Sequence, residues 1–130
     1  DQGVIVICTG GGGIPVLRMP DGSMTGIEAV IDKDAASALL AQQLGADALL
    51  LLTDVDAVYT GFGTDDEAAI AELTHEEARA LDLPAGSMGP KIKAAADFAG
   101  HGGLAGIGRL DQATAILEKR AGTRIIAETS

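Results

Sequence analysis

Four consecutive glycines, Gly10 to Gly13, follow the apolar segment Val4–Cys8 after a single residue, Thr9. A run of mostly β-branched residues that ends in backbone without side chains predicts a buried strand, over residues 3–8, opening onto a loop. Glycine is entropically costly to order, so four in succession indicate that something approaches this backbone closely. A tight turn with positive φ is the alternative, but one or two glycines would satisfy it. We therefore predict that the loop amides bind a carboxylate or a phosphate.

Predicted strands and helices alternate along the rest of the chain. A hairpin is predicted over residues 15–28, with its turn at Pro20–Ser23, and Asp32 is the predicted N-cap of a helix over 33–44. The later predicted elements are a buried strand (48–52), a loop (53–59), an exposed segment (60–67), helices (74–81, 89–98 and 111–119) and strands (104–107 and 123–127). This order predicts an α/β fold, a three-layer αβα sandwich with a mostly parallel sheet, with residues 1–130 as one domain.

Charge and composition exclude several classes of protein. The 130 residues carry 19 acidic and 9 basic side chains, and a net charge of −10 disfavours nucleic acids and anionic membranes as partners. A nucleotide is still compatible, because Mg²⁺ partly neutralises its phosphates. Cys8 is the single cysteine and is interpreted as a small buried hydrophobe. Without a recognisable signal peptide or spanning segment, we expect a cytoplasmic protein, and the abrupt start in a strand indicates the later part of a longer one.

Two of the four lysines, Lys33 and Lys91, fall at predicted helix N-termini. The helix dipole disfavours a cation there, and an anion held jointly by the lysine and the backbone amides resolves the conflict. The alternative is a pair of solvated surface lysines, but two such placements favour phosphate contact. Asp34, beside Lys33, either fixes a lysine or ligand or is simply a carboxylate that suits the dipole; the sequence leaves both interpretations open.

The segment from Thr53 to Tyr59 is the second candidate region. Ligands of parallel sheets bind beyond the carboxyl ends of the strands, and the polar pair Thr53-Asp54 ends a predicted buried strand. A ribose or phosphate would be met there. Tyr59, the only tyrosine, either lies against a base or anchors the loop.

Several familiar sites are absent from the sequence. The pattern G-x-x-x-x-G-K-[ST] does not occur, and the glycine run continues into Ile14-Pro15, so neither a P-loop nor a dinucleotide fingerprint is present. His75 and His101 lack cysteine or histidine partners at metal-binding spacing, so no protein-held metal is predicted. Ser87 is interpreted as a loop or cap residue and not as a nucleophile.

Taken together, these motifs resemble the carbamate kinases of the amino acid kinase superfamily, in order and through nearly the whole chain. The similar segments are Cys8–Val16, Glu28–Asp34, Leu51–Tyr59, Ala85–Lys91 and Ala121–Ile125. The resemblance implies the C-terminal, nucleotide-binding half of such an enzyme. Because the N-terminal half of the family pattern is missing, we expect this chain alone to be inactive or very weak.

The resemblance also implies a reaction, ATP plus carbamate giving ADP plus carbamoyl phosphate with Mg²⁺, in a homodimeric full-length enzyme. Asp34 would organise the lysines, and Lys33 and Lys91 would neutralise the transferred phosphoryl group. Gly10, Gly11, Gly12 and Gly13 would seat carbamate or phosphoryl oxygens. The residues implied on the nucleotide side are Thr53, Asp54, Val58, Tyr59, Met88 and Gly89. The implied metabolic setting is arginine fermentation or carbamoyl phosphate use.

Three other functions are alternatives to this one. The nearest is another superfamily member that phosphorylates an amino acid or a nucleoside monophosphate; Lys33 beside Asp34 and the Ser87–Lys91 segment favour carbamate. The second is a non-catalytic nucleotide-binding module. The third, a dinucleotide-dependent oxidoreductase, is disfavoured by the failed fingerprint.

Overall fold

A four-stranded sheet organises the protein. The computed structural model describes residues 3–7, 10–83 and 86–128. Its sheet has the order β3 (Ala48–Thr53), β7 (Leu104–Arg109), β8 (Thr123–Ile126) and β6 (Glu72–Thr74). The β3–β7 and β6–β8 pairs are parallel and the β7–β8 pair is antiparallel. The mostly parallel sheet predicted from the sequence is therefore confirmed.

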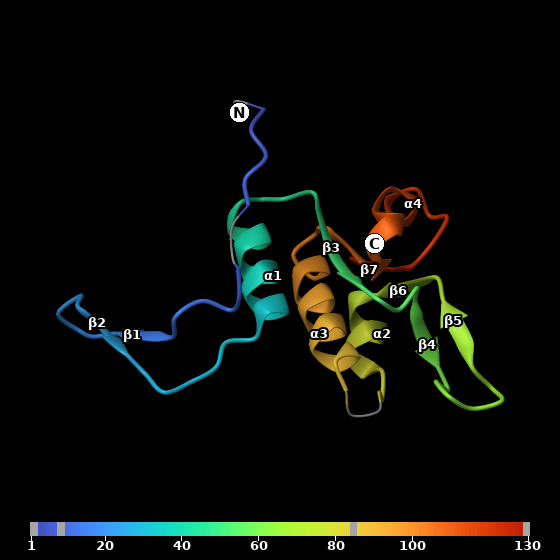
Figure 1. The fold of residues 1–130 in the computed structure, drawn as a ribbon, viewed down its shortest axis with the longest axis horizontal. Helices are drawn as coiled ribbons and strands as arrows, with labels where there is room; N and C mark the ends of the chain where they lie inside the picture. Colours follow the sequence, from blue (N-terminus) through green and yellow to red (C-terminus); the bar gives the residue numbers. More distant parts are fainter. Residues whose placement is uncertain (1–2, 8–9, 84–85, 129–130) are drawn as a thin grey trace.

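Helices cover both faces of this sheet, unequally. The helices are α1 (Lys33–Gln43), α2 (His75–Ala80), α3 (Met88–Ala99) and the short α4 (Ala113–Leu117). Figure 1 shows α1, α3 and α2 side by side. Ile107 of β7 packs in the core beneath these helices, whereas a Cβ on its neighbour Gly106 would lie 2.6 Å from Ile116 of α4. Because successive strand residues face opposite sides, α4 forms the third layer.

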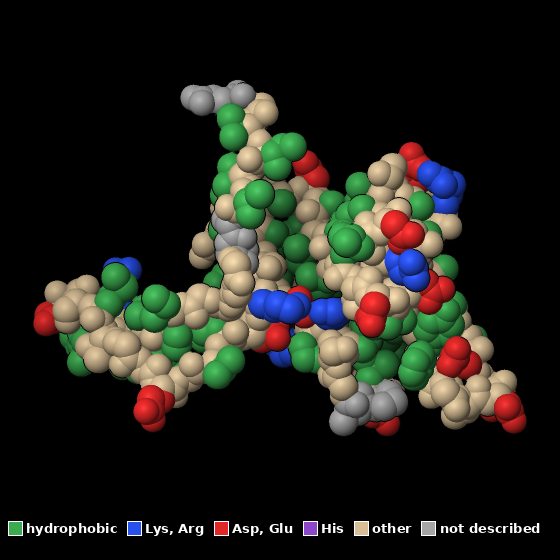
Figure 2. Space-filling model, viewed as in Figure 1, with side chains coloured by type: hydrophobic (Ala, Val, Ile, Leu, Met, Phe, Trp, Pro, Cys, Tyr) green, Lys and Arg blue, Asp and Glu red, His purple; other side chains and the backbone are tan. Residues whose placement is uncertain are grey.

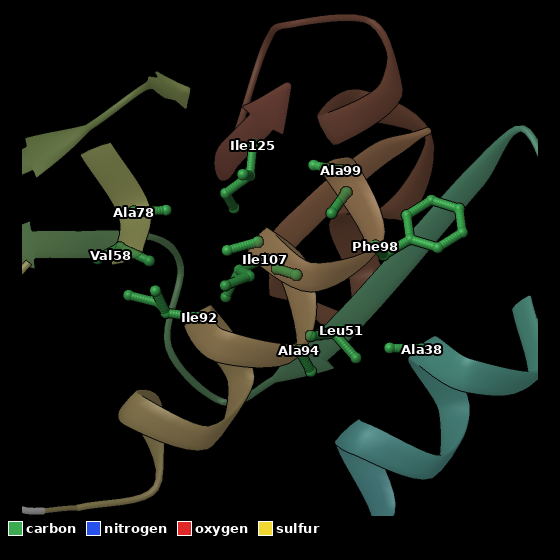
Figure 3. Close-up of a cluster of buried hydrophobic side chains, with 13 residues drawn as sticks. Ala38, Leu51, Val58, Ala78, Ile92, Ala94, Phe98, Ala99, Ile107 and Ile125 are labelled. Carbon is green, nitrogen blue, oxygen red and sulfur yellow. The ribbon is translucent and has the colours of Figure 1, made fainter. Parts of the chain in front are cut away.

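The core lies between α3 and the sheet and is built from small and aliphatic residues. Ala95, Ala96 and Ala99 of α3 have no exposed surface, so this helix approaches the strands closely. Figure 3 shows Ile92 of α3 on the side of the core where Val58 and Ala78 also lie. This packing fixes α3, and with it the start of the helix that carries Lys91.

Two hairpins lie outside the sheet (Figure 1). The first, β1 (Val16–Arg18) with β2 (Met24–Gly26), was predicted, and Gly22 in its turn has a φ of 84°. The second pairs β4 (Val58–Thr60) with β5 (Ala68–Ile70). The loop predicted over residues 53–59 is thus wrong at Val58 and Tyr59. The sequence did not predict this hairpin because a long exposed segment joins β4 to β5, whereas the clearest sequence signal for a hairpin is a two-residue turn.

The strand predicted over residues 3–8 is also wrong as far as the structure describes it. Residues 3–7 have no strand geometry, and Ile5 and Ile7 are 93% and 98% exposed. Cys8 lies outside the described residues, as do Thr9 and Ala85 of the segments quoted above. An apolar run shows that a segment could be buried, but a strand forms only where a neighbour pairs with its backbone. Among the described residues, none pairs with 3–7. Within the same part of the chain, no helix has the length and hydrophobicity needed to cross a membrane.

Candidate anion and nucleotide site

Two lysines from different helices meet on one carboxylate. Lys33 Nζ lies 2.7 Å from Asp34 Oδ1, and Lys91 Nζ lies 2.8 Å from Asp34 Oδ2. The side chains of Asp34 and Lys91 are only 11% and 10% exposed, whereas that of Lys33 is 62% exposed. In Figure 2, basic and acidic atoms lie next to each other where α1 and α3 run side by side. The site therefore has one buried cation and one that solvent, or a ligand, can reach.

The start of α1 places Asp34. The Asp32 carboxylate caps the helix by accepting hydrogen bonds from the backbone N–H groups of Asp34 and Ala35, at 3.0 and 2.9 Å. The predicted N-cap is thus confirmed. With the helix start fixed, Asp34 falls in the first turn and reaches Lys91 in the first turn of α3. Ser87, which precedes α3, makes no side-chain cap, and that first turn contains no acidic residue. The N-terminus of α3 therefore keeps the partial positive charge of its backbone N–H groups.

The charges of this cluster stabilise one another. Burial on its own would raise the pKa of Asp34, but the hydrogen bonds from Lys33 and Lys91 outweigh burial and hold that pKa below its ordinary value. The hydrogen bond to Asp34 raises the pKa of Lys33. The cluster of two ammonium groups and one carboxylate has a net charge of +1 in a protein whose total is −10. The Asp32 carboxylate at the start of α1 also acts on Lys33, so the exposed ammonium group of Lys33 is the part of the site open to an anion.

The glycine loop lies against the residue that precedes the cap of α1. A Cβ added to Gly12 would lie 1.8 Å from the carbonyl oxygen of Ile31, so only glycine allows this contact. Gly13 has a φ of 90°, which a turn explains. Neither reason applies to Gly10 or Gly11, around which a Cβ would meet no atom within 4 Å. Ligand binding by this loop, which lies close to the start of α1, stays a prediction.

An apolar cavity opens beside the first turn of α3. Its volume is about 220 Å³. Three predicted nucleotide-side residues, Val58, Tyr59 and Met88, line it. The Tyr59 hydroxyl donates a hydrogen bond of 3.0 Å to Asp56, which raises the pKa of Tyr59 and orients the ring. Since ligand pockets for whole drug-sized molecules run to roughly 300–1,000 Å³, this cavity suits a ring system without its polar substituents.

The other predicted nucleotide-side residues lie elsewhere. Thr53 and Asp54 line an open hollow of about 600 Å³ at the carboxyl ends of β3 and β7. The Thr53 hydroxyl donates to Asp54 at 3.0 Å. Gly89 lies in the first turn of α3 and lines neither space. Apart from Gly89 and the four glycines of the loop, the predicted site residues thus fall into the lysine cluster, the apolar cavity and this hollow.

Sequence reasoning missed several residues of these spaces. Phe62 and Leu83 line the apolar cavity, and the rings of Phe62 and Tyr59 lie 6.1 Å apart. Phe62 carried a usable signal, because a lone aromatic residue stands there in an exposed segment of glycine and acidic residues. Arg109, at the edge of the open hollow, gave no such signal. The described residues contain no group of three or more His, Cys, Asp or Glu side chains suited to a metal ion.

The profile of the amino acid kinase family matches residues 1–107 of the sequence. The chain belongs to the amino acid kinase family.

Within this family the chain is similar to carbamate kinases. It is 45% identical to the carbamate kinase of Rhizobium meliloti (strain 1021) and 47% identical to that of Halobacterium salinarum, over 100% and 97% of its own length. The structure of the Giardia lamblia carbamate kinase bound to AMP-PNP matches with a TM-score of 0.88 at 42% identity, over 96% of this chain. The chain covers only 41% and 42% of the two relatives and 45% of the Giardia chain. It therefore spans less than half of the proteins that it matches.

Proposed function

We propose that this chain is the C-terminal, nucleotide-binding part of a carbamate kinase. The overall reaction would be ATP plus carbamate giving ADP plus carbamoyl phosphate. In it, a carbamate oxygen forms a bond to the γ-phosphorus of ATP while the bond from that phosphorus to the ADP oxygen breaks. The observation that carries this proposal is the meeting of Lys33 and Lys91 on Asp34, beside the glycine loop and the apolar cavity.

The arrangement suits phosphoryl transfer, which depends on positioning and charge neutralisation. Lys91 and Lys33 would neutralise the transferred phosphoryl group, with Asp34 holding both ammonium groups in place. The amides of Gly10, Gly11, Gly12 and Gly13 would seat carbamate or the phosphoryl oxygens.

The same helix supports the nucleotide at two points. Met88 and Lys91 are three positions apart on α3, so they lie on one face about 4.5 Å apart along its axis. The base would enter the cavity of Val58, Tyr59 and Met88, and the phosphates would extend to Lys91. Thr53, Asp54 and Gly89 would contact the ribose or the phosphates. A neighbour with AMP-PNP bound supports a nucleotide of this size.

Mg²⁺ fits this site as an ion that arrives with the nucleotide. Mg²⁺ is commonly held by substrate phosphates, water and one or two carboxylates, so it needs no dedicated cluster of acidic side chains. Asp54 is the predicted nucleotide-side carboxylate that could add a ligand. When bound, the ion would offset the negative charge of the phosphates.

The full-length enzyme would be a cytoplasmic homodimer acting on small molecules, in arginine metabolism or carbamoyl phosphate use. It would bind neither nucleic acid nor membrane, as the acidic composition favours. The strong similarity to carbamate kinases supports carbamate over the acceptors of other amino acid kinases. The short span supports a narrower role for this chain by itself, as a nucleotide-binding module without catalysis.

Two measurements test the proposal. Calorimetric titration of the 130-residue chain with ADP should show binding that Lys91→Met weakens. An assay of ATP formation from ADP and carbamoyl phosphate should show turnover by the full-length protein and almost none by this chain. If the full-length protein forms no ATP, the assignment to carbamate is wrong. If this chain alone forms ATP as fast as the full-length protein, the proposal that it is only the nucleotide-binding part is wrong.

A further inference from the structure

We propose that Thr123 is a positioning residue that sets one wall of the nucleotide-base cavity by tying the β4–β5 hairpin to the central sheet. The inference rests on the proposed function for the identity of the ligand. The contacts of Thr123 themselves stand independently of that ligand.

The Thr123 side chain makes two hydrogen bonds inside the protein. Thr123 has no exposed surface. Its Oγ1 accepts a hydrogen bond of 2.8 Å from the backbone N–H of Val58 and donates one of 2.6 Å to the carbonyl oxygen of Ile70. Val58 and Ile70 are directly opposite each other in the β4–β5 hairpin. One hydroxyl therefore binds both strands of the hairpin at the same level.

One of those two strands, β4, contributes residues to the cavity wall, and β5 pairs with it from outside the cavity. Val58 and Tyr59 of β4, and Phe62 just beyond it, line the cavity on the hairpin side. Gly86–Met88, at the start of α3, also line it. Thr123 lies in β8, paired with Ile107 of β7. The hydroxyl thus links the aromatic wall to the same core that fixes α3.

The hydroxyl is the chemically specific part of this link. A second bond, from the backbone N–H of Arg124 to the carbonyl of Ala71 at 2.9 Å, secures the chain just after β5 but does not reach β4. Valine has nearly the shape of threonine, but it would leave the buried N–H of Val58 and the partly buried carbonyl of Ile70 without this partner. Serine would keep the hydroxyl and lose only a methyl group. The pair Thr123→Val and Thr123→Ser therefore separates hydrogen bonding from packing.

The first experiment is hydrogen exchange of the ligand-free 130-residue chain. In Thr123→Val, we expect the amides of Val58, Tyr59 and Ile70 to exchange at least tenfold faster, while those of α1 and α3 keep their rates. Thr123→Ser should stay within about threefold of the wild type. Equal exchange in all three proteins would overturn the proposal. Uniformly faster exchange in Thr123→Val would also overturn it, because it would indicate general destabilisation.

The second experiment separates the two ends of the ligand. Thr123→Val should weaken the binding of adenosine about tenfold and leave the binding of pyrophosphate unchanged, with the affinity for adenosine restored in Thr123→Ser. Equal losses for both probes would overturn a positioning role at the base cavity. If the wild-type chain binds neither adenosine nor ADP, the proposed function fails, and the base-cavity role of Thr123 fails with it. The exchange rates would then still decide whether Thr123 holds the hairpin.

Discussion

Lys91 and Asp34 are 57 positions apart in the sequence, and their side chains form an ion pair of 2.8 Å with both partners largely buried. The pair joins the first turns of α1 and α3. Removing one partner of a buried pair leaves the other charge without compensation. Breaking the pair therefore lowers the free energy of unfolding by more than the intact pair contributes to it. It links the stability of the protein to the geometry of the candidate site.

Asp34→Ala should lower the free energy of unfolding by about 3 kcal/mol, because the Lys91 ammonium group loses its buried partner. Chemical denaturation of the wild type and the variant measures this difference. Lys33→Met is the matched control, since Lys33 is 62% exposed and exposed pairs contribute under about 1 kcal/mol. Equal losses in the two variants would show that burial does not distinguish the two ion pairs.

Stability should fall in acid partly through Asp34. Its pKa is lower in the folded protein than the ordinary value of 3.8, so the unfolded chain takes up this proton more readily. The contribution of Asp34 is therefore present above pH 3.8 and is lost as the pH falls through the lower folded value. Denaturation of wild type and Asp34→Asn at several pH values measures it. The difference between them should shrink below that pH, and a constant difference would contradict the prediction.

Lys91→Met should weaken ADP binding about tenfold or more, because a charge-assisted hydrogen bond to a phosphate would be lost. Lys33→Met should weaken it similarly with little change in stability, since its side chain is exposed. Lys93→Met is the control on the same helix, because Lys93 is 77% exposed and pairs with Asp97 instead. Titration calorimetry measures all three. A loss in Lys93→Met as large as in Lys91→Met would indicate only a general effect of charge.

Gly12→Ala should displace the glycine loop, because its Cβ would lie 1.8 Å from the carbonyl oxygen of Ile31. We expect a loss of about 1–3 kcal/mol in stability, as for other overpacked sites, together with weaker anion binding. Gly11→Ala adds the same methyl group where nothing lies within 4 Å, so its stability should be close to that of the wild type. Thermal unfolding and phosphate titration compare the two variants, and identical behaviour would refute the close contact at Gly12.

The sequence by itself determined the features that depend on neighbouring residues, namely helix caps, a turn and an apolar strand. Asp32 was predicted to cap a helix and does so through bonds to amides within three residues, and Thr74 caps the helix predicted over residues 74–81 in the same way. The turn of the first hairpin and the apolar β3 were also predicted correctly. These features depend on neighbours along the chain, which the sequence shows directly.

Tertiary structure decided the rest, because the partners are distant in the sequence. The Val4–Ile7 run has strand chemistry, yet it lies exposed outside the sheet since no described strand pairs with it. Nothing local indicates that Val58 pairs with Ile70 or that the Thr123 hydroxyl joins them. The sequence placed Lys33 and Lys91 at helix starts, and only the packing of α1 on α3 brings Lys91 to the carboxylate of Asp34, which lies beside Lys33 in the chain. Side-chain hydrogen bonds and ion pairs act over about 3 Å, so contacts between distant residues exist only once the fold has formed.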